Sequence, residues 1–232
     1  MNTAPSSAGS PDSTGPTGPT GPEVLLARLR RERLAAIVRG RDARASVRAA
    51  VALAEEGVGL IEISLTTENA ERVLSEVVAE VGDRALIGAG TVLCREDADR
   101  ARGAGAAWLV TPCPGAGLEA AVDTGLPVLG GALTPGECAA VMAAGAAAVK
   151  LFPASLGGPP YLKSLRDPFP DLPIVPVGGI DADAAAAYLA AGAVAVGVGG
   201  PLLGDAPHGG DTGALRERAR TFLAVCADGA DA

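Results

Sequence analysis

The chain has 232 residues, enough for one large domain or two small ones, and 48% of them are hydrophobic. Its formal net charge is −8 with no block of basic residues, which argues against nucleic acid and anionic membranes as partners. No apolar run is long enough to span a bilayer.

The cysteines and the chain start carry information about compartment and metals. The four cysteines form no C-x-x-C pair, and the single histidine has no cluster of ligands around it. The start of the chain has neither the basic nor the apolar region of a signal peptide. We therefore expect a reducing cytoplasm, no disulfide framework and no zinc. These observations do not exclude a magnesium ion bound by carboxylates.

The first 22 residues consist largely of Ser, Thr, Gly and Pro, and we interpret residues 1–22 as a disordered tail. From residue 23 onward, helical and strand patterns alternate. The expected helices cover residues 23–33, 43–56, 69–81, 95–104, 117–123, 135–144, 161–165, 183–191 and 215–227. The expected strands cover residues 34–38, 60–65, 85–88, 108–110, 127–129, 147–151, 174–177 and 193–198.

This alternation predicts the fold class. The strands are short, continuous apolar runs, as in a parallel sheet covered by helices, and many of the helices end at a glycine. Eight such units in one chain of this length predict a compact TIM (β/α)8 barrel with an N-terminal helix, formed by a single domain over residues 23–232. The alternative is an open doubly wound sheet, which the regular count of units disfavours.

Lys150 is the most unusual residue of the apolar strands. Only two of the 19 basic residues are lysines, Lys150 and Lys163, and Lys150 has apolar neighbours throughout its strand. Arginine stays protonated, whereas burial of a lysine disfavours its ammonium form. A neutral amine can attack a ketone and form a Schiff base. The alternative is a lysine that reaches solvent from the strand end or holds an anion as a plain charge.

Glu62 is a second charged residue in an apolar strand, between Ile61 and Ile63. Its functional interpretation is a general base, and its structural alternative is an ion pair with Lys150 or Arg39. Because side chains alternate along a strand, we expect two sets to point into the barrel: Leu60, Glu62 and Ser64, and Ala148, Lys150 and Phe152.

In a TIM barrel the active site lies at the carboxyl ends of the strands. Several polar or glycine residues fall there, namely Arg39, Thr91, Thr111-Pro112, Gly178-Gly179 and Gly199-Gly200. The two Gly-Gly turns favour a phosphate site, since their backbone N–H groups can approach an anion without a Cβ in the way. We interpret Cys113 as a small apolar filler, and His208 and Lys163 as surface residues.

Five motifs carry a resemblance to a known family. They are Ile61-Glu62-Ile63-Ser64-Leu65-Thr66-Thr67, Gly88-Ala89-Gly90-Thr91-Val92-Leu93, Thr111-Pro112, Lys150-Leu151-Phe152-Pro153-Ala154 and Val177-Gly178-Gly179-Ile180. With these motifs in order, residues 34–204 resemble the class I 2-keto-3-deoxy-6-phosphogluconate and -galactonate aldolases. The resemblance implies cleavage of a phosphorylated 2-keto-3-deoxy sugar acid to pyruvate and glyceraldehyde 3-phosphate, without a metal or other cofactor. Some members also act on 4-hydroxy-2-oxoglutarate, and members are commonly homotrimers.

The resemblance also implies residue roles. Lys150 would be the Schiff-base lysine and Glu62 the proton-transferring base. Thr91 and Pro112 would line the pyruvate moiety, with Phe152 packed beside the imine. Arg39 matches a binding arginine found in part of the family.

Three positions depart from the gluconate-type pattern. Thr66 stands where those enzymes have an arginine, and Val177 stands where they have a threonine and galactonate-type enzymes have a valine. Gly200 replaces a serine that is common in the last phosphate loop, which leaves only backbone donors there. The activity is thus better specified than the substrate.

Two other functions fit the residues alone. One is a barrel isomerase or cyclase for a sugar phosphate, with Glu62 as base and Lys150 as an electrostatic clamp. The other is a non-catalytic barrel that binds a phosphorylated ligand. Only the aldolase requires a covalent intermediate on Lys150.

Overall fold

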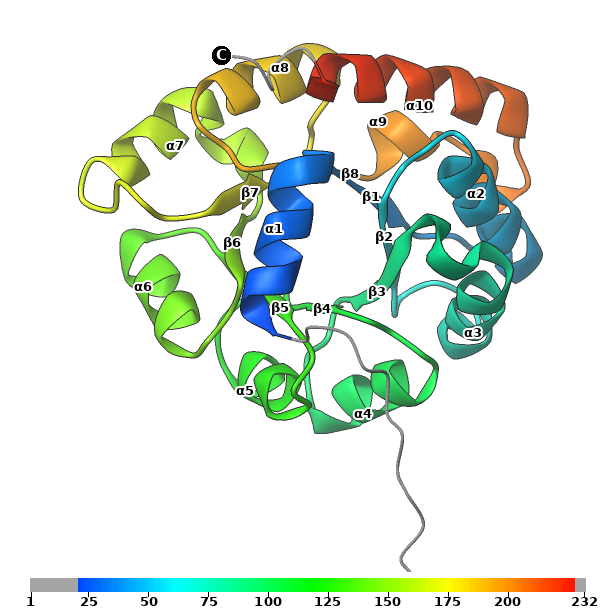
Figure 1. The fold of residues 1–232 in the computed structure, drawn as a ribbon, viewed down its shortest axis with the longest axis horizontal. Helices are drawn as coiled ribbons and strands as arrows, with labels where there is room; N and C mark the ends of the chain where they lie inside the picture. The colour runs from blue at the N-terminus through cyan, green and yellow to red at the C-terminus, as the bar shows by residue number, and fades with distance from the viewer. Residues whose placement is uncertain (1–20, 228–232) are drawn as a thin grey trace, which may run out of the picture.

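The fold is a TIM-like α/β barrel, seen in a computed structural model that describes residues 21–227 (Figure 1). Its described strands are β1 (Leu34–Val38), β2 (Leu60–Ser64), β3 (Leu86–Gly90), β4 (Leu109–Val110), β5 (Val128–Ala132), β6 (Ala148–Leu151), β7 (Ile174–Pro176) and β8 (Val196–Val198). Every strand pair is parallel, and the order around the barrel is β7-β6-β5-β4-β3-β2-β1-β8. A single bridge between Val177 and Gly197 joins the two edge strands, so the barrel is nearly closed.

Helices surround the sheet. The α-helices of residues 21–227 are α1 (Pro22–Glu32), α2 (Ala43–Glu55), α3 (Ala70–Val81), α4 (Arg95–Gly103), α5 (Ala116–Asp123), α6 (Pro135–Ala143), α7 (Gly158–Arg166), α8 (Ala182–Ala190), α9 (Gly200–Leu203) and α10 (Thr212–Ala227). Short 3-10 turns occur at η1 (Gly82–Arg84), η2 (Ala154–Leu156) and η3 (Ala206–His208). The predicted barrel with an N-terminal helix is confirmed.

The inside and outside of the barrel have separate apolar cores. Ile61 and Ile63 of β2 and Val149 and Leu151 of β6 pack outward against the helices. Leu60 and Ala148, on the opposite faces of the same strands, belong to the inner core. The predicted alternation is therefore confirmed, and it places Glu62 and Lys150 on the inward faces.

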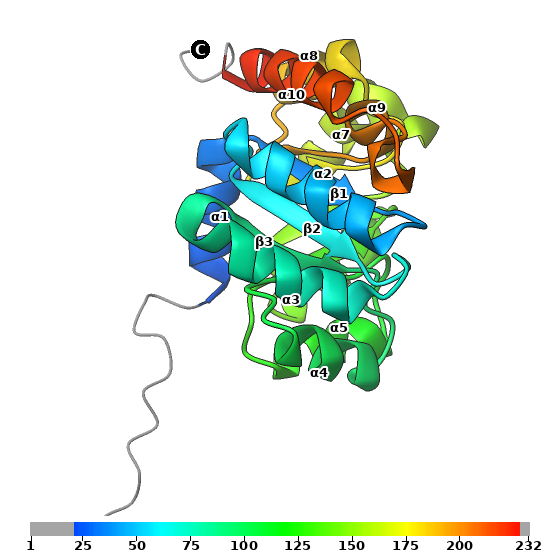
Figure 2. The ribbon, with the colours of Figure 1, turned by 90° about the vertical axis from the view of Figure 1, so that its right-hand side faces the viewer.

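Helix α1 closes one end of the barrel. Leu25 and Leu29 are fully buried in the inner core, beside Trp108. Figures 1 and 2 show α1 lying across the end at which the strands begin, while α9 lies at the other end. Because α1 covers the amino ends of the strands, the barrel is open to a ligand at their carboxyl ends.

Some element boundaries differ from the expected ones. Helix α1 begins at Pro22, within the expected tail, and residues 1–20 of that tail lie outside the described residues. Strands β3 and β5 continue through glycines that the apolar pattern did not include, to Gly90 and Ala132. Helix α7 begins at Gly158, not Tyr161, since its two prolines occupy the first turn, where no backbone N–H is needed.

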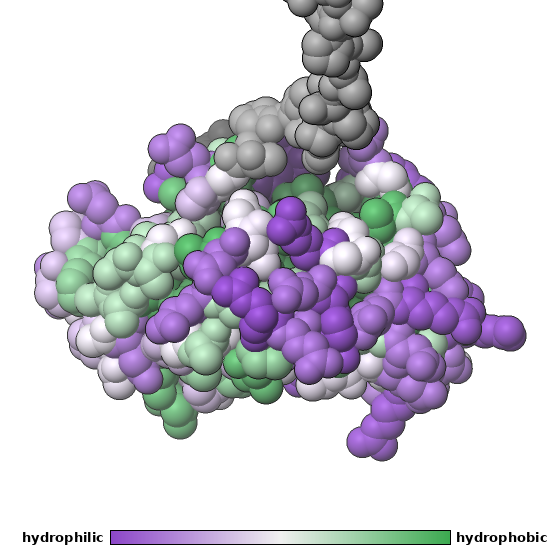
Figure 3. Space-filling model, turned by 90° about the horizontal axis from the view of Figure 1, so that it is seen from below, coloured by the Kyte–Doolittle hydropathy of each residue, from purple (hydrophilic) through white to green (hydrophobic). Residues whose placement is uncertain are grey.

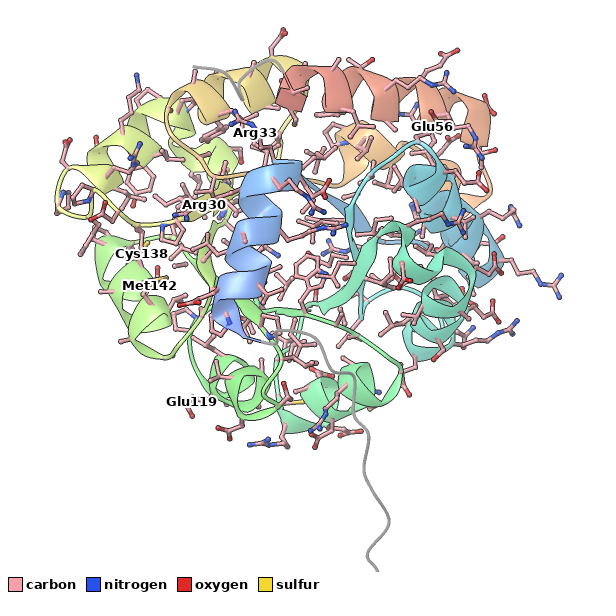
Figure 4. All side chains as sticks on the ribbon, in the orientation of Figure 1. Arg30, Arg33, Glu56, Glu119, Cys138 and Met142 are labelled. Atoms are coloured by element: carbon pink, nitrogen blue, oxygen red, sulfur yellow. The ribbon has the colours of Figure 1, made fainter. Side chains whose placement is uncertain are left out.

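Ion pairs hold α10 against α2 on the outside. Glu56, labelled in Figure 4, follows the last residue of α2 and pairs with Arg216 and Arg220 of α10. Hydrogen bonds from Arg220 and then Arg216 hold the pKa of Glu56 below its ordinary value.

The face over α4 is largely hydrophilic (Figure 3). Within the described residues, no helix is long and apolar enough to cross a membrane.

Candidate active site

A cavity of about 550 Å³ opens at the carboxyl ends of the strands. It is lined by Ile37, Arg39, Thr66, Thr91, Pro112, Lys150, Phe152, Val177, Gly178, Gly179, Gly199, Gly200, Pro201, Leu203, Gly204 and His208. Every predicted site residue except Glu62 is in this set. A cavity of about 300 Å³ at the amino ends of β3 and β4, lined by Arg28 and Asp83 among others, contains no predicted site residue.

Lys150 lies on β6 with only 6% of its surface exposed. Its strand neighbours are Gly131 of β5 and Val175 of β7. Its Nζ lies 5.5 Å from the centre of the Phe152 ring, and it takes part in none of the ion pairs of residues 21–227. The amine is thus buried at the wall of a cavity, next to an aromatic face and without a carboxylate partner.

Glu62 is not among the residues that line the cavity. It is 2% exposed on β2, beside Gly88 of β3, and its Oε1 is buried without a hydrogen-bond partner. The ion pair with Lys150 or Arg39, considered from the sequence, is wrong: none of the described ion pairs includes Glu62. A buried carboxylate oxygen without a partner is costly, and such groups need an explanation in function or bound solvent.

Ser64 connects three of the predicted residues. Its Oγ receives a hydrogen bond from Arg39 Nε at 3.4 Å, and it shares hydrogen bonds with Thr66 Oγ1 at 2.8 Å and Thr91 Oγ1 at 3.0 Å. Ser64 itself is fully buried. The sequence placed it on the inner face of β2 but gave it no role at the site, since a serine is not unusual in a strand.

Thr91 is held in an uncommon backbone conformation. Its φ is 67°, in the left-handed region that β-branched residues rarely adopt. This conformation ends β3 and places Thr91 at the cavity and within reach of Ser64. Strain of this kind is found most often at functional sites.

The neighbouring strand ends depend on a close backbone approach. The main chain of Pro112 lies so near Gly131 that a Cβ atom there would overlap it. The buried Thr111 accepts a hydrogen bond from Gly131 N at 3.3 Å through its Oγ1. Thr111 therefore stabilises the contact between the two strand ends. Of Thr111 and Pro112, only Pro112 lines the cavity.

The turn after β7 encloses the side of the cavity near Phe152. Gly178 and Gly179 have φ of 103° and 73°, and a Cβ on Gly178 would lie 3.2 Å from the Phe152 ring. Val177, 5% exposed, lines the cavity directly before this turn. The backbone of Ala154 donates to Val177 O at 2.9 Å, which ties the loop after Lys150 to the same turn.

Three residues were expected to have no role at the site, and the structure places them in different surroundings. Lys163 is exposed on α7, as expected. Cys113 is exposed, so its interpretation as a small apolar filler is wrong. His208 is exposed, but it also lines the cavity, beside the turn that follows β8. No pattern in the sequence indicates this position, because the loop after α9 has no regular periodicity.

Among the described residues, no group of three or more His, Cys, Asp and Glu side chains could hold a metal ion. The site consists instead of an amine, a carboxylate, three hydroxyl groups, an arginine and glycine turns. Such a set can perform nucleophilic addition, proton transfer and anion binding.

The chain is similar to several known proteins. The family model described as "KDPG and KHG aldolase" matches residues 25–212. The 2-dehydro-3-deoxy-6-phosphogalactonate aldolase of Escherichia coli K12 is 35% identical over 171 residues, which cover 73% of this chain and 83% of that protein. The 2-dehydro-3-deoxy-phosphogluconate aldolase of Pseudomonas aeruginosa is 38% identical over 141 residues, or 60% of this chain and 64% of that protein. A solved structure titled "Native KDPGal structure" is 32% identical, with a TM-score of 0.78, and the match covers 84% of this chain and 95% of that one.

The chain belongs to the family of KDPG and KHG aldolases. It is therefore an aldolase, a carbon–carbon lyase, as the resemblance implied. The comparisons favour this activity over a sugar-phosphate isomerase or cyclase and over a non-catalytic binding barrel.

Proposed function

We propose that Lys150 is the Schiff-base nucleophile of this class I aldolase and that Glu62 moves the protons. The substrate we propose is a 2-keto-3-deoxy-6-phospho sugar acid, cleaved to pyruvate and glyceraldehyde 3-phosphate, and 4-hydroxy-2-oxoglutarate is a further candidate. The observation that carries the proposal is the buried Lys150 amine at the wall of the cavity, with no ion-pair partner among residues 21–227.

The reaction begins at the C2 ketone. The neutral amine of Lys150 adds to C2 and forms a carbinolamine, which loses water to give an iminium ion. The iminium withdraws electrons from the C3–C4 bond. Glu62, directly or through a water molecule, accepts the proton of the C4 hydroxyl as this bond breaks and the aldehyde leaves. The remaining enamine is protonated at C3, and hydrolysis of the iminium releases pyruvate and restores the amine.

The other cavity residues orient the substrate. Thr91 and Pro112 line the part of the cavity proposed for the pyruvate moiety, and the Phe152 ring packs beside the imine nitrogen. The remaining proposed binding residues are Arg39, Thr66, Val177, Gly178, Gly179, Gly199 and Gly200. The glycines after β7 and β8 would hold the phosphate, since no Cβ shields their backbone N–H groups.

Reduction with borohydride tests the nucleophile. Pyruvate and borohydride should leave a reduced three-carbon adduct on Lys150, which peptide mass spectrometry can locate. The exposed Lys163, the other lysine of the chain, is an internal control for non-specific modification. Lys150→Arg should abolish both the adduct and turnover, because a guanidinium does not become a neutral amine. An adduct on Lys163 alone, or none, would exclude the Schiff-base mechanism.

We further propose that the enzyme acts in the cytoplasm and assembles as a homotrimer. One similar structure, 32% identical with a TM-score of 0.78, is a cage designed by fusing symmetric oligomeric domains, which supports self-association of this fold. Light scattering coupled to size-exclusion chromatography would give the mass of the assembly. A monomer at micromolar concentration would contradict the proposal.

A further inference from the structure

His208 belongs to the rim of the cavity on the side where β8 and β1 meet. It shares the cavity with Arg39, which follows β1, and with Gly199 and Gly200, which follow β8. Gly200 carries no side chain, and a Cβ atom built there would meet nothing within 4 Å. This part of the cavity therefore has open space beside a glycine turn, and among the residues that line the cavity His208 is the ionisable one nearest along the chain to that turn.

The position of His208 is fixed by close packing. Pro207 is buried, and its carbonyl oxygen accepts a hydrogen bond from Ser46 Oγ at 3.4 Å. Its side chain approaches Gly40 so closely that a Cβ there would lie 2.8 Å from Pro207 Cβ. The 3-10 turn that contains His208 is closed by a hydrogen bond from His208 N to Asp205 O at 2.8 Å. The turn is thus packed onto the end of β1 and the start of α2.

The ring orientation of His208 is also defined. Its Nδ1 accepts a hydrogen bond from the backbone N–H of Arg41 at 3.2 Å. An imidazole nitrogen that accepts a hydrogen bond carries no proton, so the neutral ring has its proton on Nε2. Nε2–H is then the remaining polar atom of the ring, and it is a donor. A donor fixed at the rim of this cavity suits an anionic ligand group.

We infer that His208 donates a hydrogen bond from Nε2 to the phosphate of the substrate and supplies the side-chain donor that Gly200 lacks. This inference rests on the proposed function, since it assigns the residue to the phosphate end of the same substrate. The phosphate does not react, so its hydrogen bond contributes about equally to the ground state and the transition state and acts mainly on KM.

The kinetic test compares substrates with and without the phosphate. In His208→Ala, kcat/KM for the phosphorylated 2-keto-3-deoxy acid should fall by about ten- to a hundredfold relative to that for the unphosphorylated acid. The loss should appear in KM. Adding Gly200→Ser to His208→Ala should restore part of the preference, because the serine hydroxyl would enter the open space as a donor. Lys163→Ala is the matched control on the exposed surface and should behave as the parent.

A spectroscopic test does not depend on turnover. Since the chain contains one histidine, histidine labelled with ¹⁵N gives signals from His208 alone. Inorganic phosphate should shift the Nε2 signal in a saturable manner, and acetate at equal ionic strength should not.

The outcomes separate the two proposals. Absence of pyruvate release and of the Lys150 adduct in the parent would refute the proposed function. An active parent in which His208→Ala keeps the same preference for the phosphorylated substrate would overturn the assignment of His208 alone. A drop in kcat for both substrates to the same extent would also overturn it, because that pattern indicates a general disturbance of the site.

Discussion

The carboxylate of Glu62 lies directly against Gly90, so close that a Cβ atom at position 90 would overlap its Oε1. Glu62 is on β2 and pairs in register with Gly88 of β3, and Gly90, two residues further along, ends β3 on the same face. The absence of a side chain at position 90 thus provides the space that the buried carboxylate occupies. Gly90 therefore determines the position that the carboxylate of the proposed base, Glu62, can occupy.

Gly90→Ala should therefore displace Glu62. We expect kcat to fall by about a hundredfold or more, the lower end of what a general base contributes. Steady-state pyruvate release measures the effect. Gly103→Ala is the matched control, since a Cβ on Gly103 of α4 meets nothing within 4 Å, and it should keep parental activity. Parental activity in Gly90→Ala would mean that the position of the carboxylate is unimportant.

Glu62→Gln keeps the shape of the side chain and removes the base. Turnover should fall by about 10²–10⁴-fold, while the affinity for a pyruvate analogue changes far less. Turnover kinetics and analogue titration on the same preparation separate the two effects. Nearly full activity in the variant would show that the carboxylate is structural and that another group moves the proton.

Buried thiols provide a test of the packing away from the site. Cys138 and Cys226 are buried, and burial raises the pKa of each thiol to about 11. At pH 8 both remain protonated, whereas a thiolate is needed for reaction. A disulfide reagent at that pH should label the exposed Cys94 and Cys113 rapidly, and the other two only after denaturation. Rapid labelling of all four in the native protein would contradict the described core.

Much of the site was predictable because its chemistry conflicts with its surroundings. Lys150 and Glu62 are charged residues within apolar strands, and burial makes such residues rare outside functional roles. The fold fixed the direction of both side chains through strand alternation alone. The same reasoning placed Arg39, Thr91 and the glycine turns at one end of the barrel, where the cavity lies.

The remaining features depend on contacts between distant segments. Ser64 joins Arg39, Thr66 and Thr91, but a serine in a strand does not stand out from its neighbours. His208 reaches the cavity because Pro207 packs on Gly40, a contact across more than 160 positions. Strand β8 begins only at Val196, since pairing with β1 and not apolar character sets its start. Such information resides in the tertiary structure.

We expect substrate choice to depend on Val177, which lines the cavity between the Gly178-Gly179 turn and the barrel interior. Its side chain packs against Gly197, where a Cβ atom would lie 2.6 Å from Val177 Cγ2, so its orientation is fixed by the neighbouring strand β8. From this position, between the proposed imine and the phosphate turn, the side chain would lie beside C4 of the substrate. Threonine has the same shape as valine but adds a hydroxyl, which could hydrogen-bond the C4 hydroxyl in one configuration only.

The parent should therefore discriminate weakly between the gluconate- and galactonate-configured substrates or favour the galactonate one. Thr66 stands where gluconate-type enzymes have an arginine, and this difference also favours the galactonate-configured substrate. One added hydrogen bond contributes about 0.5–1.5 kcal/mol, so Val177→Thr should shift the ratio of kcat/KM towards the gluconate epimer by up to about tenfold. The measurement is kcat/KM for both C4 epimers in the parent and the variant. Strong selectivity of the parent for the gluconate epimer, unaltered in Val177→Thr, would place the determinant of configuration at another residue of the cavity.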